Sequence, residues 1–194
     1  PMMVLVCGYG SAGQRHAVNL MAMDHDVVVY DPALPAHPGG VKGWVPSLAV
    51  GLSLPIINHV MICSAARFHA EQTIQALKAG KEVFVEKPLA WTVEEGEAVC
   101  EAAKQARKVV AVGYQWCFYE PLLVLRQRLR TLNWSSAILQ YEGNRQAWPG
   151  NSYEDLLLEC SHEIEIARWL FGPISLVLDS ASVSDSRAKI KFLD

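Results

Sequence analysis

Residues 6–16 read VCGYGSAGQRH, and this stretch decides the fold that the rest of the chain is expected to complete. Gly8, Gly10 and Gly13 form the pattern G-x-G-x-x-G between an apolar run and a helical pattern. In dinucleotide-binding loops the first glycine allows a tight turn, the second lets a pyrophosphate approach the backbone, and the third lets helix and strand pack closely. The helix that follows offers free N–H groups and a partial positive charge to phosphates. The stretch therefore predicts a dinucleotide-binding loop.

Asp31 closes the next apolar run, about 20 residues beyond the glycine loop, where an acid can accept hydrogen bonds from ribose hydroxyls. Its carboxylate would repel a 2′-phosphate, so NAD is the expected cofactor rather than NADP. The alternative is a structural glycine turn, with Asp31 capping a proline turn. Strand, helix and acid together favour the cofactor, and Tyr9 and Ala12 are counted among its expected contacts.

Short apolar runs continue along the chain without polar alternation. Such runs, rich in β-branched residues, are typical of parallel strands covered on both faces. The predicted strands are Met3–Cys7, Val27–Tyr30, Val60–Cys63, Val83–Val85 and Val109–Val112.

Helical patterns separate these runs. Apolar residues between positions 70 and 77 recur at helical spacing and are followed by Gly80, a typical C-terminal stop. Thr92 and Glu95 form a possible capping box before a second such pattern. Segment 31–54 is the least regular part. The alternation predicts an α/β fold with a doubly wound parallel sheet.

Composition excludes several classes of function. The 194 residues carry a net charge of −3, so neither nucleic acid nor an anionic membrane is an expected partner. The five cysteines form no C-x-x-C pair and no spacing typical of metal ligands, so neither a disulfide framework nor a metal site is expected. The apolar start is too short for a signal peptide. The expected location is the cytoplasm.

The predicted strand Val83–Val85 ends abruptly in Glu86, Lys87 and Pro88. In an open parallel sheet, ligands bind beyond the carboxyl ends of the strands, which is the edge where the glycine loop also lies. The two charges are therefore expected to face a cofactor. The alternative is an ion pair at a solvated strand end.

Residues 65–95, AARFHAEQTIQALKAGKEVFVEKPLAWTVEE, resemble the signature of the Gfo/Idh/MocA oxidoreductases. The resemblance covers almost the whole chain, from GYGSAGQRH at residues 8–16 to SHEIEIARWLFG at residues 161–172. It implies a Rossmann domain, residues 1–116, followed by a smaller and shortened α+β domain, residues 117–194. It also implies that Lys87 is catalytic and that Glu86 holds the cofactor. The other cofactor positions that it implies are Ser64, Ala65, His69 and Gln115.

The second domain is expected to supply the substrate side of the site. In LLLECSHEIEIARWLFG, Glu159 and His162 lie on one face of a predicted helix. The resemblance implies that His162 is an acid/base partner of Lys87 and that Glu159 orients it. A histidine packed in a helix is the alternative.

Strands in this domain are expected within 137–141, 174–184 and 189–193. So few strands would leave unpaired edges and apolar surface near Trp169, Leu170 and Phe171. A homo-oligomer is therefore expected, built from either a fragment or a reduced family member.

The function implied is NAD-dependent hydride transfer with a sugar, a polyol or a related hydroxyl compound. Two alternatives stay open at this point. One is redox-assisted glycoside hydrolysis in the same family, in which the hydride leaves and returns. The other is a non-catalytic subunit or sensor that binds NAD(H).

Overall fold

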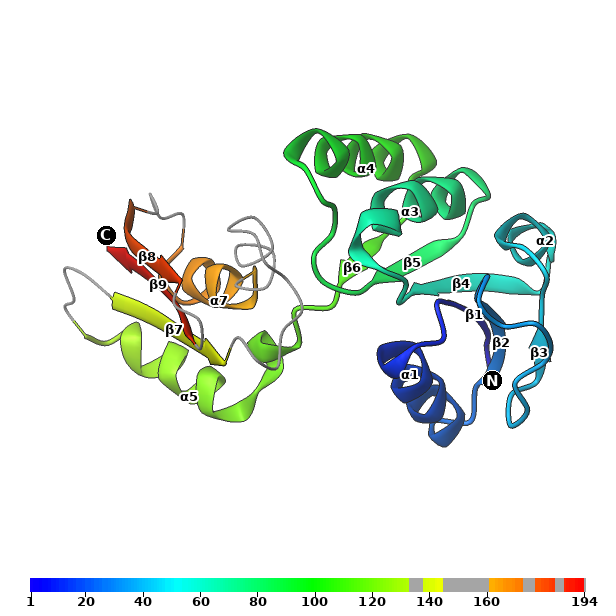
Figure 1. The fold of residues 1–194 in the computed structure, drawn as a ribbon, viewed down its shortest axis with the longest axis horizontal. Coiled ribbons are helices and arrows are strands. Elements are labelled where there is room, and N and C mark those ends of the chain that lie inside the picture. The colour runs from blue at the N-terminus through cyan, green and yellow to red at the C-terminus, as the bar shows by residue number, and fades with distance from the viewer. Residues whose placement is uncertain (133–137, 145–160, 173–176, 184–186, 194) are drawn as a thin grey trace. The chain divides into compact units, whose positions relative to one another are not determined.

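The computed structural model describes residues 1–132, 138–144, 161–172, 177–183 and 187–193. The chain divides into two compact units, Pro1–Gly113 and Tyr114–Asp194 (Figure 1). The boundary predicted after residue 116 falls inside a short 3-10 turn, η2, Gln115–Phe118.

The first unit is built on a six-stranded sheet in the order β3-β2-β1-β4-β5-β6, with every neighbouring pair parallel. This is the strand order of the doubly wound dinucleotide-binding fold, so the predicted α/β class is confirmed. The strands are β1 Met3–Cys7, β2 Asp26–Tyr30, β3 Gly43–Trp44, β4 Ile57–Ile62, β5 Glu82–Val85 and β6 Val110–Val112. The helices are α1 Ser11–Ala22, α2 Leu48–Ser53, η1 Ala66–Phe68, α3 His69–Lys78 and α4 Val93–Ala106.

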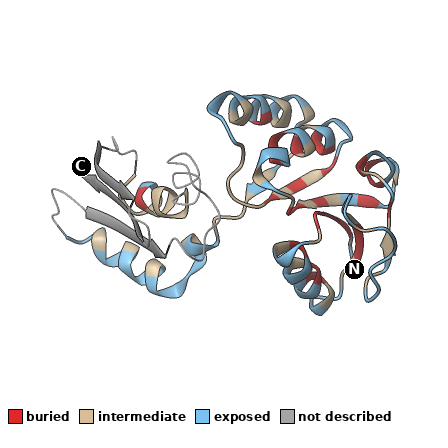
Figure 2. Ribbon diagram, in the orientation of Figure 1, coloured by how far each residue is buried: buried red, intermediate tan, exposed pale blue. Residues whose placement is uncertain are grey.

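Alternate residues of the central strands feed two cores, one on each face of the sheet. Leu5 belongs to a cluster that also holds residues of α2 and α3, while Val6 belongs to a cluster with Ala17 and Leu20 of α1. Figure 2 shows the buried residues concentrated in the strands and on the helix faces turned toward them. Burial on both faces explains why β1 reads as a continuous apolar run.

The helix-capping signals found in the sequence coincide with helix ends in the structure. Thr92 caps α4 and Glu95 completes the predicted capping box. Gly80 follows α3 with a φ of +75°, in the left-handed region that glycine adopts without strain. Segment 31–54 is irregular, but it also contains β3 and α2, which its prolines concealed in the sequence.

Lys81 is a buried cation that the sequence did not assign. Its side chain crosses to the start of β4, and Nζ donates to the carbonyls of Leu54 at 3.1 Å and Ile57 at 2.6 Å. These hydrogen bonds satisfy two backbone oxygens at the end of the sheet opposite the glycine loop. Lys81 therefore belongs to the fold.

We expect Lys81→Met to lower the free energy of unfolding by about 1–3 kcal/mol, because the carbonyls of Leu54 and Ile57 would each lose the hydrogen bond from Nζ. Urea unfolding followed by circular dichroism measures this. Lys78→Met is the matched control, because Lys78 is exposed one turn earlier in the same stretch. Equal stability of the two variants would contradict the structural role.

The second unit contains a three-stranded antiparallel sheet in the order β7-β9-β8. The three strands predicted here are confirmed. Sequence periodicity did not predict the helix that follows η2. The elements are α5 Glu120–Leu129, β7 Ile138–Asn144, α7 Ser161–Phe171, β8 Val177–Val183 and β9 Arg187–Leu193. Across the described ranges, none of the helices combines the length and apolarity needed to span a membrane.

Candidate functional site

The glycine loop joins β1 to α1 at the carboxyl end of the sheet. Gly8 has a φ of +87°, and its N–H donates to the Tyr30 carbonyl at 2.8 Å. A Cβ on Gly8 would lie 2.5 Å from the Ser64 nitrogen, and one on Gly13 would overlap the Gly8 carbonyl oxygen. Both glycines are thus required by close approach of backbone to backbone, as the motif predicted.

Gly10 differs from the other two glycines. Its φ is −71°, and a Cβ built on it would meet no atom within 4 Å. Nothing in the protein's own packing demands glycine at this position. The open space lies at the N-terminus of α1, where unpaired N–H groups and the helix dipole favour phosphate. The loop therefore fits the pyrophosphate of a dinucleotide.

Asp31, directly after β2, is hydrogen-bonded to this loop. Oδ2 accepts from the Tyr9 N–H at 2.6 Å, and Oδ1 accepts from the Ala33 N–H at 2.8 Å. A carboxylate has about four acceptor positions, so capacity for ribose hydroxyls is left.

Asp31 also lines a cavity of about 390 Å³ beside Gly8, which reaches as far as Ser64, Ala65 and α3. The predicted ribose acid therefore stands at a cavity next to the loop. These features fit the adenosine half of a dinucleotide as the loop fits its phosphates.

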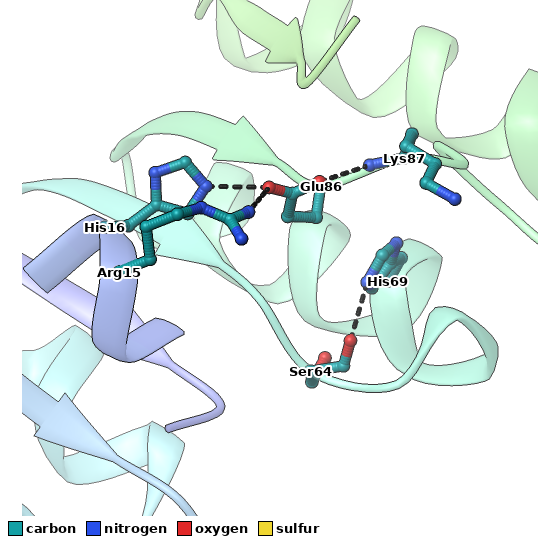
Figure 3. A network of polar contacts seen from close by, with 6 residues as sticks. All are labelled: Arg15, His16, Ser64, His69, Glu86 and Lys87. Atoms are coloured by element: carbon teal, nitrogen blue, oxygen red, sulfur yellow. Dashed lines mark hydrogen bonds and ion pairs between the residues drawn. The ribbon is translucent and has the colours of Figure 1, made fainter. Parts of the chain in front are cut away.

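Glu86, directly after β5, reaches back to the helix that begins at the glycine loop. Oε1 accepts from Nε2 of His16 at 2.7 Å and lies 3.8 Å from Nη2 of Arg15, while Oε2 accepts from the Lys87 N–H at 3.2 Å (Figure 3). Burial raises the pKa of Glu86, but the hydrogen bond and charge of His16 outweigh it, and the net pKa is lowered. Glu86 is thus held as an anion beside α1, and the solvated strand end is not what the structure contains.

Neither Arg15 nor His16 was among the predicted site residues. Both belong to the quoted glycine-loop stretch, but only the packing of α1 against β5 brings them to Glu86. The ring of His16 also meets that of Phe84 edge-on, with centroids 5.4 Å apart. A basic residue shortly after the last glycine was the only signal that the sequence offered.

His69 and Ser64 were predicted to line the nicotinamide side. The His69 side chain is almost fully buried, with Nδ1 2.6 Å from the Pro88 carbonyl oxygen and Nε2 2.9 Å from that of Ser64. The Ser64 hydroxyl donates to Gln72 at 2.7 Å. Both ring nitrogens of His69 therefore face carbonyl oxygens of the protein itself, which favours a role in shaping the turn after β5.

The remaining predicted positions lie as follows. Lys87 is half-buried, and Figure 3 shows its side chain extending away from the Glu86 carboxylate. Ala12 is half-buried in the first turn of α1. Gln115 is exposed at the start of η2 and belongs to the second unit. Their contacts with a cofactor stay predictions.

His162 lies in the first turn of α7 within the second unit. Its ring meets the rings of Tyr114 at 5.8 Å and Trp116 at 6.3 Å, both edge-on. Burial raises the pKa of Tyr114. Glu159 lies outside the described residues. The acid/base roles of His162 and Glu159 stay predictions, and the aromatic neighbours of His162 were not foreseen.

Metal ligands do not converge in the part of the chain that the structure describes, where no group of three His, Cys, Asp or Glu side chains could hold an ion.

Known proteins resemble the chain along most of its length. It is 29% identical over 182 residues to the scyllo-inositol 2-dehydrogenase (NAD(+)) of Bacillus subtilis, covering 86% of this chain and 53% of that protein. It is 30% identical over 138 residues to the D-glucoside 3-dehydrogenase of Escherichia coli, covering 66% of this chain and 39% of that protein. The chain thus spans about half the length of the first relative and less of the second.

Solved structures share the fold. The scyllo-inositol dehydrogenase of Lactobacillus casei, with bound NAD(H) and scyllo-inositol, superposes with a TM-score of 0.78 at 23% identity, covering 92% of this chain and 57% of that one. The model of the family described as "Oxidoreductase family, NAD-binding Rossmann fold" matches residues 2–114, which include the glycine loop and the turn after β5. The chain therefore belongs to the Gfo/Idh/MocA oxidoreductase family.

Proposed function

We propose that this chain binds NAD and forms the nucleotide-binding part of a dehydrogenase acting on a hydroxyl group of a sugar or polyol. The observation that carries the proposal is the 2.7 Å hydrogen bond from His16 to Glu86. It brings the turn that bears Lys87 next to the helix of the glycine loop. A phosphate-binding loop and an amine that can accept a proton thus share one edge of the sheet.

The roles follow from this geometry. NAD, when bound, supplies the hydride acceptor. Gly10 and the N-terminus of α1 would hold its phosphates, and Asp31 its ribose. Lys87 would take the proton of the substrate hydroxyl, a transfer that a positioned amine can make. His162 and Glu159 would assist from the second unit, which we assign to substrate binding and oligomerisation.

The names of the relatives support the substrate class. Both name dehydrogenases of ring-bearing polyhydroxy compounds, an inositol and a glucoside. A hydroxyl of such a compound is therefore the proposed substrate group.

The test is an assay for NADH with NAD⁺ and a panel of inositols and methyl glucosides. A dehydrogenase accumulates NADH with at least one of them. Release of methanol from a glucoside without net NADH would instead identify a redox-neutral hydrolase. Binding of NAD by calorimetry with no turnover of any compound would identify a sensor or a non-catalytic subunit. Failure to bind NAD would overturn the proposal.

Cofactor choice gives a prediction about Asp31. We expect the wild type to bind NAD more tightly than NADP, because the added phosphate would face the Asp31 carboxylate. Asp31→Asn should narrow that preference. It should also weaken NAD binding, since an amide offers one oxygen to the two N–H groups that the carboxylate holds, those of Tyr9 in the loop and of Ala33. Calorimetric titration of both cofactors measures this, and tighter NADP binding by the wild type would refute the assignment.

Assembly gives a further prediction. Trp169, Leu170 and Phe171, expected on the surface, are half-buried, and Trp169 is covered by the Arg126 guanidinium 4.2 Å from its ring centroid. Large exposed apolar side chains lie instead on and beside α5, where Phe118 is 83% and Leu123 47% exposed. We expect burial of this surface in a homo-oligomer. Sedimentation equilibrium tests it, and a monomer at micromolar concentration would contradict it.

We place the protein in the cytoplasm. The four described cysteines, Cys7, Cys63, Cys100 and Cys117, are free, and reduced thiols are typical of that compartment. Burial raises the pKa of the Cys63 thiol to about 12, so it would stay protonated and unreactive.

A further inference from the structure

The turn that bears Lys87 is held from two sides. Before Lys87, the Glu86 carboxylate accepts a hydrogen bond from His16 at 2.7 Å. After Lys87, the carbonyl of Pro88 lies 2.6 Å from Nδ1 of His69. Figure 3 shows the two histidines approaching the turn from different helices, His16 from α1 and His69 from the start of α3.

We propose that His16 and His69 are positioning residues that fix the backbone on either side of Lys87. His16 in addition ties Lys87 to the helix that receives the cofactor phosphates. This inference rests on the proposed function, because it concerns the lysine that would accept the substrate proton.

The hydrogen bond between His16 and Glu86 is largely shielded from water. The side chains of His16 and Glu86 are each 17% exposed, so water competes little for their hydrogen bond. Hydrogen bonds to a charged group are stronger than neutral ones. Arg15 is the weaker contact, since it is 57% exposed and 3.8 Å away. Gly113 closes another side of Glu86, because a Cβ there would lie 3.1 Å from Oε2.

His69 contacts two carbonyls at once. Nε2 lies 2.9 Å from the Ser64 oxygen while Nδ1 faces Pro88, so one ring bridges the segments after β4 and after β5. The ring is 1% exposed. A neutral imidazole has one N–H, so His69 donates to one of these carbonyls at a time, and only an imidazolium would donate to both. A glutamine also carries its donors on a single nitrogen, but it lacks the rigid ring that fits between the two segments. It can, however, place an N–H near the position of Nε2, which is the atom that His16 uses.

The chemistry therefore predicts different responses to the same replacement. His16→Gln should keep the hydrogen bond to Glu86, whereas His16→Leu removes it and leaves a carboxylate short of a donor. His69→Gln should lose the rigid ring between the two segments and fail to hold the turn in place. Arg15→Gln is the matched control on α1, because it removes a charge beside Glu86 but not the close hydrogen bond.

The first measurement is kinetic, in single turnovers of NAD⁺ with a substrate found in the panel above. We expect His16→Leu to slow hydride transfer by about 10²-fold, the effect of a misplacement near 1 Å, with little change in KM for the substrate. His16→Gln should recover most of the rate, and Arg15→Gln should slow hydride transfer much less than His16→Leu, because it leaves the 2.7 Å hydrogen bond in place. Because His16 acts through Glu86, adding Glu86→Gln to His16→Leu should cost little more than the more severe single variant.

The second measurement needs no substrate. Acetic anhydride labels lysines, and mass spectrometry compares the rate at Lys87 with that at exposed Lys78 in the same sample. We expect His16→Leu and His69→Gln to change the Lys87 rate several-fold, while the Lys78 rate stays constant and His16→Gln resembles the wild type.

The outcomes separate this inference from the proposed function. An unchanged Lys87 labelling rate in folded His16→Leu and His69→Gln overturns the inference, even if the wild type proves to be a dehydrogenase. A changed rate in a protein that turns over none of the panel upholds the positioning role and removes the proposed reaction. If His16→Leu does not fold, His16→Phe takes its place, because it keeps a ring beside Phe84 but has no donor for Glu86, and an unchanged Lys87 labelling rate in His16→Phe and His69→Gln overturns the inference.

Discussion

Lys87→Met is expected to abolish turnover while NAD binding stays nearly intact. Methionine keeps the length and the apolar stem of the side chain but cannot accept a proton. Loss of a positioned acid or base costs on the order of 10²–10⁴ in rate. The cofactor contacts assigned to Gly10 and Asp31 lie elsewhere on the sheet edge and are untouched. Single-turnover hydride transfer and calorimetric titration of NAD⁺ measure the two effects separately.

Two variants serve as controls for Lys87→Met. Lys78→Met removes an exposed lysine and should leave both quantities unchanged. Glu86→Gln should act differently, because Glu86 contacts His16 on the glycine-loop helix. We expect it to weaken NAD binding or change its orientation, which Lys87→Met leaves intact, and also to slow hydride transfer because the turn that bears Lys87 loses its anchor on His16. Full activity of Lys87→Met would end the catalytic interpretation of the turn.

Gly10→Ala is expected to weaken NAD binding without loss of stability, whereas Gly13→Ala is expected to destabilise the fold. A Cβ at Gly10 meets no protein atom within 4 Å, so the fold should tolerate it. The methyl group would occupy space assigned to the pyrophosphate, and we expect NAD affinity to fall on the order of tenfold, equivalent to about 1.4 kcal/mol. Calorimetry measures the affinity.

A Cβ at Gly13 would instead overlap the Gly8 carbonyl, so α1 must move away from β1. Overpacking of this kind costs about 1–3 kcal/mol of stability, and cofactor binding should fall with it. Urea unfolding of both variants separates the cases. If Gly10→Ala bound NAD like the wild type, the pyrophosphate would not lie where the loop geometry puts it.

Local signals in the sequence were sufficient for most of the first unit. Apolar runs predicted the central strands because both faces of a parallel sheet are buried, and this leaves a pattern in the residues themselves. Capping and glycine signals act within a few residues, so Thr92 and Gly80 could be read directly. The helix α5 was not predicted, because its hydrophobic periodicity is weak and three of its apolar residues, Leu123, Val124 and Leu125, are exposed.

For the candidate site, too, local sequence signals determined one part and tertiary contacts the other. The sequence alone determined that the glycine loop, Asp31 and Lys87 stand at one edge of a parallel sheet, since strand ends and topology follow from local pattern. Tertiary structure decided what each side chain touches. His16 meets Glu86 only because β4 lies between β1 and β5, which packs α1 against a strand end 70 residues away. His69 is buried between two carbonyls, and Lys81 caps the opposite end of the sheet, for the same reason. Contacts between residues distant in the chain depend on strand order and register, which no local periodicity encodes.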